Sequence, residues 1–340
     1  MDFNAIIKEI GRGARGARGL TPALARESFT ALLNAEVSDV QLGAWWAAQR
    51  IKGETAEELH AFVQAMHDTV AWRVDREPGS RALIVLPCYN GARQLPNLTP
   101  LLAHAFIARG FDVLMQGVIA DPSRVTTYSM CRALNLPITE TKDDTERALA
   151  SKHVAFVPIG AMHPKLAALL ARRWQIGVRS APHTVAKLLN PVNPANPACG
   201  TTMNAIQVVA LTHGDYVDRM AEYLQTHCLQ GLVFRGCEGE PVLHPKRNVS
   251  VLLFQNGTCD MRDWNGVETH DLPDTCGVET SANYIQSVID QQRVMPPWID
   301  ALALLAQEVA RRAQELAQPA PGVAQGMHSK IHDVENNITS

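Results

Sequence analysis

From residue 82 onward, short apolar runs alternate with segments of helical spacing, and this alternation restricts the possible folds more than any other feature. Apolar runs of strand length stand at 82–87, 111–117, 153–160, 231–236 and 249–254. Each of the first three is followed by a segment whose apolar residues recur at helical spacing. Strands and helices that alternate in this way are typical of βαβ units around a largely parallel sheet.

The first 72 residues carry a different pattern, which predicts helices only. Thr21 before Pro22, and Ser38 before another apolar-periodic segment, are signals of a helix start, while Gly11 and Gly53 stand where helices are expected to end. A chain of 340 residues is also long for one core. We therefore predict an α/β protein with a small all-helical N-terminal domain and a large α/β domain that has a mostly parallel central sheet.

The domain limits follow from where these patterns change. The helical N-terminal domain is expected to cover residues 1–75, and the α/β domain residues 80–317. Residues 318–340 have little hydrophobic pattern and are predicted to form a flexible C-terminal tail.

The composition excludes several classes of protein. Hydrophobic residues make up 46% of the chain and charged residues 19%, as in ordinary globular proteins. The sequence contains no run of about 20 apolar residues, so no membrane span is predicted. The N-terminus lacks the pattern of a signal peptide. Seven scattered cysteines without a CxxC pair argue against a zinc site and a disulfide framework, so we expect reduced thiols in a cytoplasmic protein without a metal or cofactor. The net charge of −3 means that binding to nucleic acid would need a local basic patch.

A first candidate site follows the first predicted strand. Backbone N–H groups in the loop 89–93 and at the helix start 97–99 could hold a phosphate beside Arg93, although an ordinary turn between a strand and a helix explains the same residues. The loop lacks the GxGxxG and GxxxxGK[ST] motifs, so a nucleoside triphosphate site is not expected. The candidate residues are Tyr89, Asn90, Gly91, Arg93, Asn97 and Thr99.

A second candidate is the segment GRGARGARGL, in which Arg12, Arg15 and Arg18 recur every third residue. A helix would place them along one side, and a glycine-hinged loop would let them follow a phosphate backbone; a solvated linker is the alternative. Lys52, near the end of the third predicted helix, belongs to the same N-terminal region and adds to its basic charge.

A third candidate lies in the helical segment 163–191, where the basic residues Arg173, Arg179, His183 and Lys187 are crowded. His183 could be a helix cap, a hydrogen-bonded core residue or a phosphate contact, and it has no evident partner for work as a catalytic base. The nearest approach to a paired acidic motif is Glu238 and Glu240 in GCEGEP, which a surface turn explains.

This third segment resembles a known family. HP at 163–164, RR at 172–173 and NP at 190–191 are similar to the HP…R…LGxRT…NP segment of anthranilate phosphoribosyltransferases, and RIKGET at 50–55 resembles a turn of the same family. The resemblance extends over roughly residues 1–315. It implies the glycosyltransferase family 3 fold, in which helices from about 164–190 complete the small domain, and a homodimer formed through that domain.

The departures from the family decide the expected function. The enzymes hold phosphoribosyl pyrophosphate with a GTGGDG loop, where this chain reads LPCYNGARQLPNLT, and their KHGN motif is replaced by residues 115–118, MQGV. The acidic pair that holds magnesium is reduced to Glu238 and Glu240. Arg173 falls on the position of the arginine that contacts anthranilate, and Lys187 replaces a proline. A site without the diphosphate loop and the metal pair is poorly suited to stabilise a departing pyrophosphate.

The motifs YNGAR, NLTPLL and HTVAKL, in this order, resemble those of the non-catalytic branch typified by the bacterial protein YbiB. Membership implies sequence-nonspecific binding of nucleic acid, DNA and possibly RNA, in basic grooves of a protein that is not an enzyme. One alternative is a phosphoribosyl or glycosyl transferase with an altered donor or acceptor, and another is a regulatory dimer that binds a protein. No aromatic platform for stacking bases is evident from the sequence.

Overall fold

The structure is a computed structural model. It describes residues 1–13, 15–77, 79–192, 205–238, 240–255, 257–268, 271–273 and 275–317, without the side chains of 215 and 313–317. The tail predicted at 318–340 lies outside the described residues.

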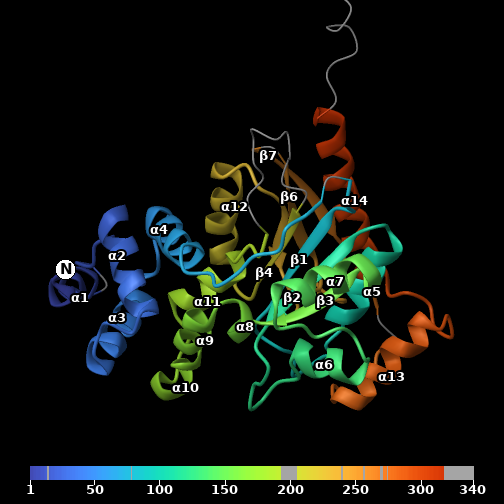
Figure 1. The fold of residues 1–340 in the computed structure, drawn as a ribbon, viewed down its shortest axis with the longest axis horizontal. Helices are drawn as coiled ribbons and strands as arrows, with labels where there is room; N and C mark the ends of the chain where they lie inside the picture. Colours follow the sequence, from blue (N-terminus) through green and yellow to red (C-terminus); the bar gives the residue numbers. More distant parts are fainter. Residues whose placement is uncertain are drawn as a thin grey trace, which may run out of the picture.

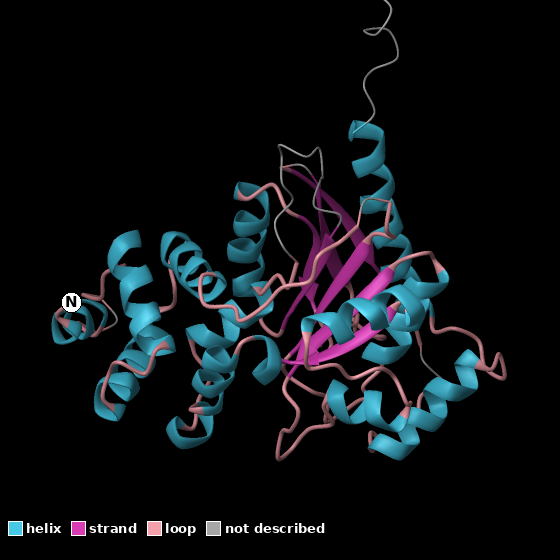
Figure 2. Cartoon of the chain, viewed as in Figure 1, coloured by secondary structure: helices cyan, strands magenta, loops and turns pink. Residues whose placement is uncertain are grey.

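A seven-stranded sheet forms the centre of the large domain, in the order β3-β2-β1-β4-β5-β6-β7 (Figure 2). The strands from β3 to β5 run parallel, and β6 and β7 are added antiparallel. This confirms the predicted fold class. The bounds are β1 (Leu83–Cys88), β2 (Asp112–Gly117), β3 (Val154–Pro158), β4 (Ala205–Leu211), β5 (Gln230–Arg235), β6 (Val249–Gln255) and β7 (Thr258–Trp264).

Helices cover both faces of the sheet, which explains why every residue of β1 is buried. Ile84 and Leu86 belong to one apolar cluster, and Leu83 and Val85 to the other. The helices of this domain are α5 (Thr99–Ala108), α6 (Thr127–Ala133), α7 (Lys142–Lys152), α12 (Val217–Thr226), α13 (Val278–Ile289) and α14 (Pro297–Ala317), with the 3-10 turn η3 (Gly214–Tyr216) before α12.

The N-terminal helices are α1 (Phe3–Ile10), α2 (Pro22–Leu33), α3 (Asp39–Lys52) and α4 (Ala56–His67). As predicted, the Thr21 side chain caps α2 and the Ser38 side chain caps α3. Packing of α2, α3 and α4 centres on three fully buried rings: Phe29 lies 5.0 Å from Phe62 and 6.3 Å from Trp45 between ring centroids.

A second group of short helices lies between these helices and the sheet (Figure 1). It comprises α8 (Ile159–Met162), α9 (Pro164–Ala171), α10 (Arg173–Ile176), α11 (Ala181–Val185) and the 3-10 turn η1 (Ala186–Leu188). The indole N–H of Trp46 donates to the carbonyl of Val178 at 2.9 Å, and the Ser180 hydroxyl donates to the carbonyl of Trp46 at 3.0 Å. The segment is thereby tied to α3.

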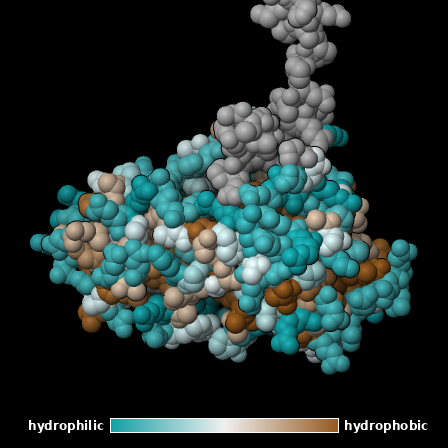
Figure 3. All heavy atoms as spheres, in the orientation of Figure 1, coloured by the Kyte–Doolittle hydropathy of each residue, from teal (hydrophilic) through white to brown (hydrophobic). Residues whose placement is uncertain are grey.

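The visible face in Figure 3 is mostly hydrophilic where it is coloured, with apolar residues scattered over it, as is usual for a protein surface in water. Within the described residues, no helix combines the length and apolar character needed to cross a membrane.

Candidate anion-binding site at the carboxyl edge of the sheet

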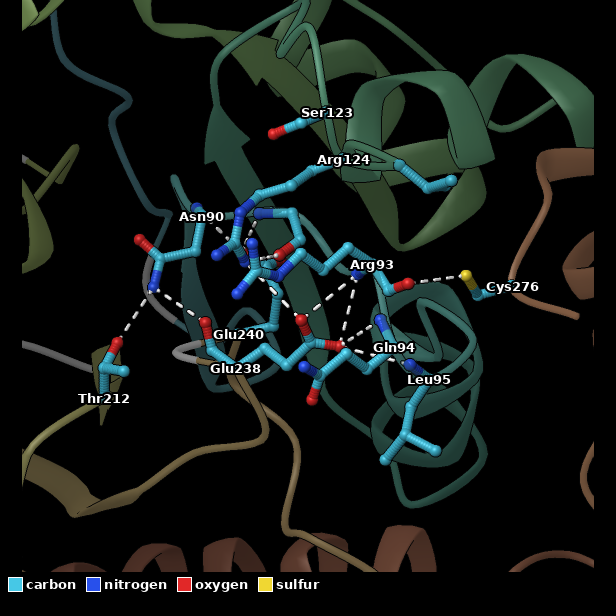
Figure 4. A network of polar contacts seen from close by, with 12 residues as sticks. Asn90, Arg93, Gln94, Leu95, Ser123, Arg124, Thr212, Glu238, Glu240 and Cys276 are labelled. Carbon is cyan, nitrogen blue, oxygen red and sulfur yellow. Dashed lines mark hydrogen bonds and ion pairs between the residues drawn. The ribbon is translucent and has the colours of Figure 1, made fainter. Parts of the chain in front are cut away.

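Three loops meet where the parallel strands end. They are the loop 89–98 between β1 and α5, the loop 118–126 between β2 and α6, and the loop 236–248 between β5 and β6. Parallel strands place their carboxyl ends at one edge of a sheet, where α/β proteins commonly bind ligands. Figure 4 shows residues of all three loops pointing toward one another.

Glu240 is enclosed by donors from the first loop and from the first residues of α5 and α6. Its Oε1 accepts from the backbone N–H groups of Asn90 and Gly91 at 2.8 and 2.7 Å. Its Oε2 accepts from the hydroxyls of Thr127 and Thr99 at 3.0 and 3.5 Å. Glu240 is only 3% exposed, so its interpretation as a surface-turn residue is wrong. A buried carboxylate with four donors is a structural anchor of the loop after β1.

Glu238 binds the next residues of the loop 89–98 (Figure 4). Its Oε1 accepts from three consecutive backbone N–H groups, those of Arg93, Gln94 and Leu95, at 3.2, 2.9 and 3.1 Å. Arg124 lies 3.6 Å from its Oε2. Successive N–H groups that converge on one point form a nest suited to phosphate. Here the chain's own carboxylate fills the nest, and a phosphate would have to displace it.

The cations Lys187 and Arg179 lie close enough to Glu240 to interact with its charge. Lys187 is 6% exposed, and burial lowers the pKa of its ammonium to about 8 while the charge of Glu240 opposes the shift. Arg179 donates to Oδ1 of Asn90. Burial lowers the pKa of Arg179 to about 10, and the positive charges of Arg173 and Arg124 contribute in the same direction. These three arginines therefore lie close enough to influence one another.

The buried part of the predicted phosphate site is less accessible than the sequence suggested. Each of its members is below the surface: Tyr89, Asn90, Gly91, Asn97, Thr99 and Lys187. The Asn97 amide donates to the carbonyl of Val125 at 3.0 Å and to the Thr127 hydroxyl at 3.2 Å. In the described conformation the backbone N–H groups of Asn90 and Gly91 and the amide of Asn97 are thus already occupied by protein acceptors.

The other predicted residues are dispersed. Arg12, Arg15 and Arg18 are exposed in the loop between α1 and α2, at the outer end of the helical domain and far from the sheet (Figure 1). Arg12 pairs with Glu9. Lys52 pairs with buried Glu58, so it stabilises the helical domain. Among the described residues, Arg12, Arg15 and Arg18 therefore do not join the loop after β1 in one site.

Two predicted residues remain near the edge of the sheet. Arg173 pairs with Asp121 at 3.3 Å, and His183 packs edge-on against Trp46. Burial, together with the charges of Arg179 and Arg173, lowers the pKa of His183 well below its ordinary value, so its ring is neutral at neutral pH.

The sequence interpretation missed a basic cavity of about 600 Å³ beside the nest. Within the described residues Glu238 is the only carboxylate that lines it, and of its arginines and lysine only Arg124 pairs with a carboxylate. Burial lowers the pKa of His244, and the charges of Arg247 and Arg235 add to the effect. The basic lining residues are Arg93, Arg124, Arg235, His244, Lys246 and Arg247. The run HPKRN at 244–248 was the sequence signal for this site.

The carboxylates do not fit a magnesium site. Magnesium requires free carboxylate oxygens in an octahedral arrangement. Oε1 of Glu238 and both oxygens of Glu240 accept from protein donors, and the Arg124 guanidinium lies beside Oε2 of Glu238. The described part of the chain also contains no group of three or more His, Cys, Asp or Glu side chains that could hold a metal ion.

Comparisons with known proteins agree with this architecture. Residues 4–70 match the helical bundle domain of the glycosyl transferase family. Anthranilate phosphoribosyltransferase from Thermus thermophilus superposes with a TM-score of 0.69, at 21% identity over 93% of this chain and 97% of that one. The Saccharomyces cerevisiae enzyme in complex with PRPP and Mg gives a TM-score of 0.71, at 14% identity over 92% of both chains. The fold is thus of the anthranilate phosphoribosyltransferase type.

Relatives found by sequence identify the family to which the chain belongs within this fold class. Uncharacterized protein YbiB of Escherichia coli (strain K12) is 34% identical over 300 residues, which cover 87% of this chain and 90% of YbiB. An anthranilate phosphoribosyltransferase of Anaeromyxobacter sp. (strain Fw109-5) is 30% identical over 229 residues, 60% of this chain and 65% of that enzyme. The chain belongs to the family of YbiB.

Proposed function

We propose that this protein binds nucleic acid without sequence specificity, with phosphates held in the basic cavity. The observation that carries the proposal is that Arg93, Arg235, Lys246 and Arg247 surround one cavity without an ion pair among the described residues. Cations collected in this way repel one another, and an anion relieves that repulsion. The net charge of −3 does not oppose such local binding, because potentials near a cleft depend on nearby charges.

Further cations favour a polymer over a single phosphate. Arg124 lines the cavity. Arg179 and Arg173 lie close enough to Arg124 that its positive charge contributes to lowering the pKa of both. A series of cations that extends beyond one cavity matches a chain of phosphates. Contacts of this kind position a nucleic acid backbone without reading its sequence.

The rival proposal, a phosphoribosyl or glycosyl transferase with an altered donor, has the fold in its favour. Against it stand the carboxylates of Glu238 and Glu240, which take the N–H groups that a diphosphate would need. A diphosphate brought beside them would also be repelled by their charge. The MQGV segment at 115–118 supplies no cation to replace the missing KHGN lysine.

Self-association through the helical domain is part of the proposal. Val40 and Ile51, two large apolar side chains on α3, are 82% and 74% exposed and would be covered if two copies associated through this helix. Two copies would present two basic cavities to one strand, and binding at both would raise the affinity through avidity.

The proposal is tested by fluorescence anisotropy with labelled single- and double-stranded DNA and single-stranded RNA at several salt concentrations. For four or five phosphate contacts we expect the slope of log K against log salt to be about −3 for single strands, from about 0.7 per phosphate. Calorimetry with phosphoribosyl pyrophosphate and magnesium is expected to show no binding. Absence of nucleic acid binding at low salt would refute the proposal, and magnesium-dependent binding of the sugar diphosphate would favour the transferase.

A further inference from the structure

A second cavity, of about 470 Å³, is lined by other residues of the loop 118–126, which also contributes to the basic cavity. Arg124 of this loop lines the basic cavity, whereas Val118, Ile119 and Asp121 line the second one. Most of the second lining is apolar and includes Pro158, Ile159, Ala161 and Leu170. Its volume falls in the range of small-molecule sites.

An exposed aromatic ring stands at this cavity. Trp174 on α10 lines it and is 51% exposed, and the Arg173 guanidinium lies 3.9 Å from the centroid of the indole. An indole stacked with an arginine is a surface on which planar rings bind. The sequence analysis did not single out Trp174 for this role.

Two buried polar atoms in the lining have no hydrogen-bond partner within the described residues. They are the hydroxyl of Tyr89, a side chain only 3% exposed, and Nδ1 of His183. Leaving such a group unsatisfied costs about 1–3 kcal/mol. A planar ligand with polar atoms on its edge would satisfy them, whereas a purely apolar ligand would not.

The charges of the lining favour a neutral ring. Asp121 pairs with Arg173 at 3.3 Å and compensates its charge, and Glu140 adds a further carboxylate. His183 is neutral at neutral pH because burial lowers its pKa. Because Arg173 is already paired with Asp121, the described lining offers no unpaired cation for an aromatic carboxylate, so a neutral heteroaromatic ring fits better.

We propose that this cavity takes an unpaired nucleobase, stacked at Trp174 and hydrogen-bonded to Tyr89 and His183, from a strand whose phosphates lie in the basic cavity. This inference rests on the proposed nucleic acid binding. The two cavities share the loop 118–126, so one strand crossing that loop places a phosphate on one side and a base on the other. The protein therefore prefers single strands to duplexes, in which the bases are paired and stacked.

The test compares a labelled 12-nucleotide single strand with a strand of the same length that carries abasic sites throughout, by anisotropy at matched salt. Stacking contributes about 1–3 kcal/mol per base, so we expect the abasic strand to bind roughly 5- to 150-fold more weakly. Trp174→Ala is expected to weaken binding of the base-containing strand about 10-fold and to leave the abasic strand unaffected. Trp174→Phe should retain most of the affinity.

Leu304→Ala serves as the matched control, since it removes another apolar side chain that is 51% exposed, on α14 and outside both cavities. Equal affinity for the base-containing and abasic strands would overturn the base site and leave phosphate binding intact. If neither strand binds, the proposed function itself fails. A loss with Trp174→Ala that is equal for both strands would also contradict the base site, because it would indicate an effect on phosphate binding alone.

Discussion

Reversing the charges of Arg235, Lys246 and Arg247 together, each to Glu, is expected to weaken binding of single-stranded DNA on the order of 100-fold at 0.1 M salt. These three side chains line the basic cavity and have no ion pair among the described residues. Their replacement removes contacts with phosphates and adds repulsion. The salt slope should also fall by about 2, because each single-strand phosphate contact contributes about 0.7.

The matched control reverses three exposed cations outside the cavity, Lys8, Arg132 and Lys152, which gives the same change in net charge. A loss confined to the cavity variant would locate the site, whereas equal losses would indicate only a general charge effect and contradict it. Reversal of Arg15 and Arg18 tests the residues that the sequence favoured. Their loop lies at the far end of the helical domain, so we expect a smaller loss.

Glu240→Ala is expected to lower the free energy of unfolding by about 3–5 kcal/mol, as for other buried charged groups whose partners are left behind. The substitution strips the acceptor from the N–H groups of Asn90 and Gly91 and from the hydroxyl of Thr127. Lys187 limits the cost, since burial already lowers its pKa to about 8 and it can release its proton. The measurement is urea denaturation at neutral pH.

Glu240→Gln should cost less than Glu240→Ala, because the amide keeps one acceptor oxygen of the same size and position. Glu222→Ala, on the exposed side of α12, is the control and should change stability by no more than about 0.5 kcal/mol. A loss below about 1 kcal/mol for Glu240→Ala would show that Glu240 does not anchor the loop after β1.

The sequence predicted the parallel core because β1, β2, β3 and β5 are short apolar runs followed by turn residues. The edge strand β7, TCDMRDW, was missed because none of its residues is fully buried and its few apolar residues alternate with polar ones. Helix α7, KDDTERALASK, is almost entirely polar, so its apolar pattern was too weak to predict a helix.

The candidate site was harder to predict than the fold. Glu238 and Glu240 lie near the loop after β1 only in space, with Glu238 bonded to Arg93 across 145 residues of sequence. No local pattern reports such a pairing, so a turn at the surface was the natural interpretation. The basic run at 244–248 was visible in the sequence, but its meeting with Arg93 and Arg124 depends on the order of strands in the sheet.

A crystal structure of the protein with a short single-stranded oligonucleotide tests the central claim most directly. We expect electron density for a phosphate among Arg235, Lys246 and Arg247, while Glu238 still accepts from the N–H groups of residues 93–95. A phosphate in the nest, with Glu238 displaced and the basic cavity empty, would contradict it.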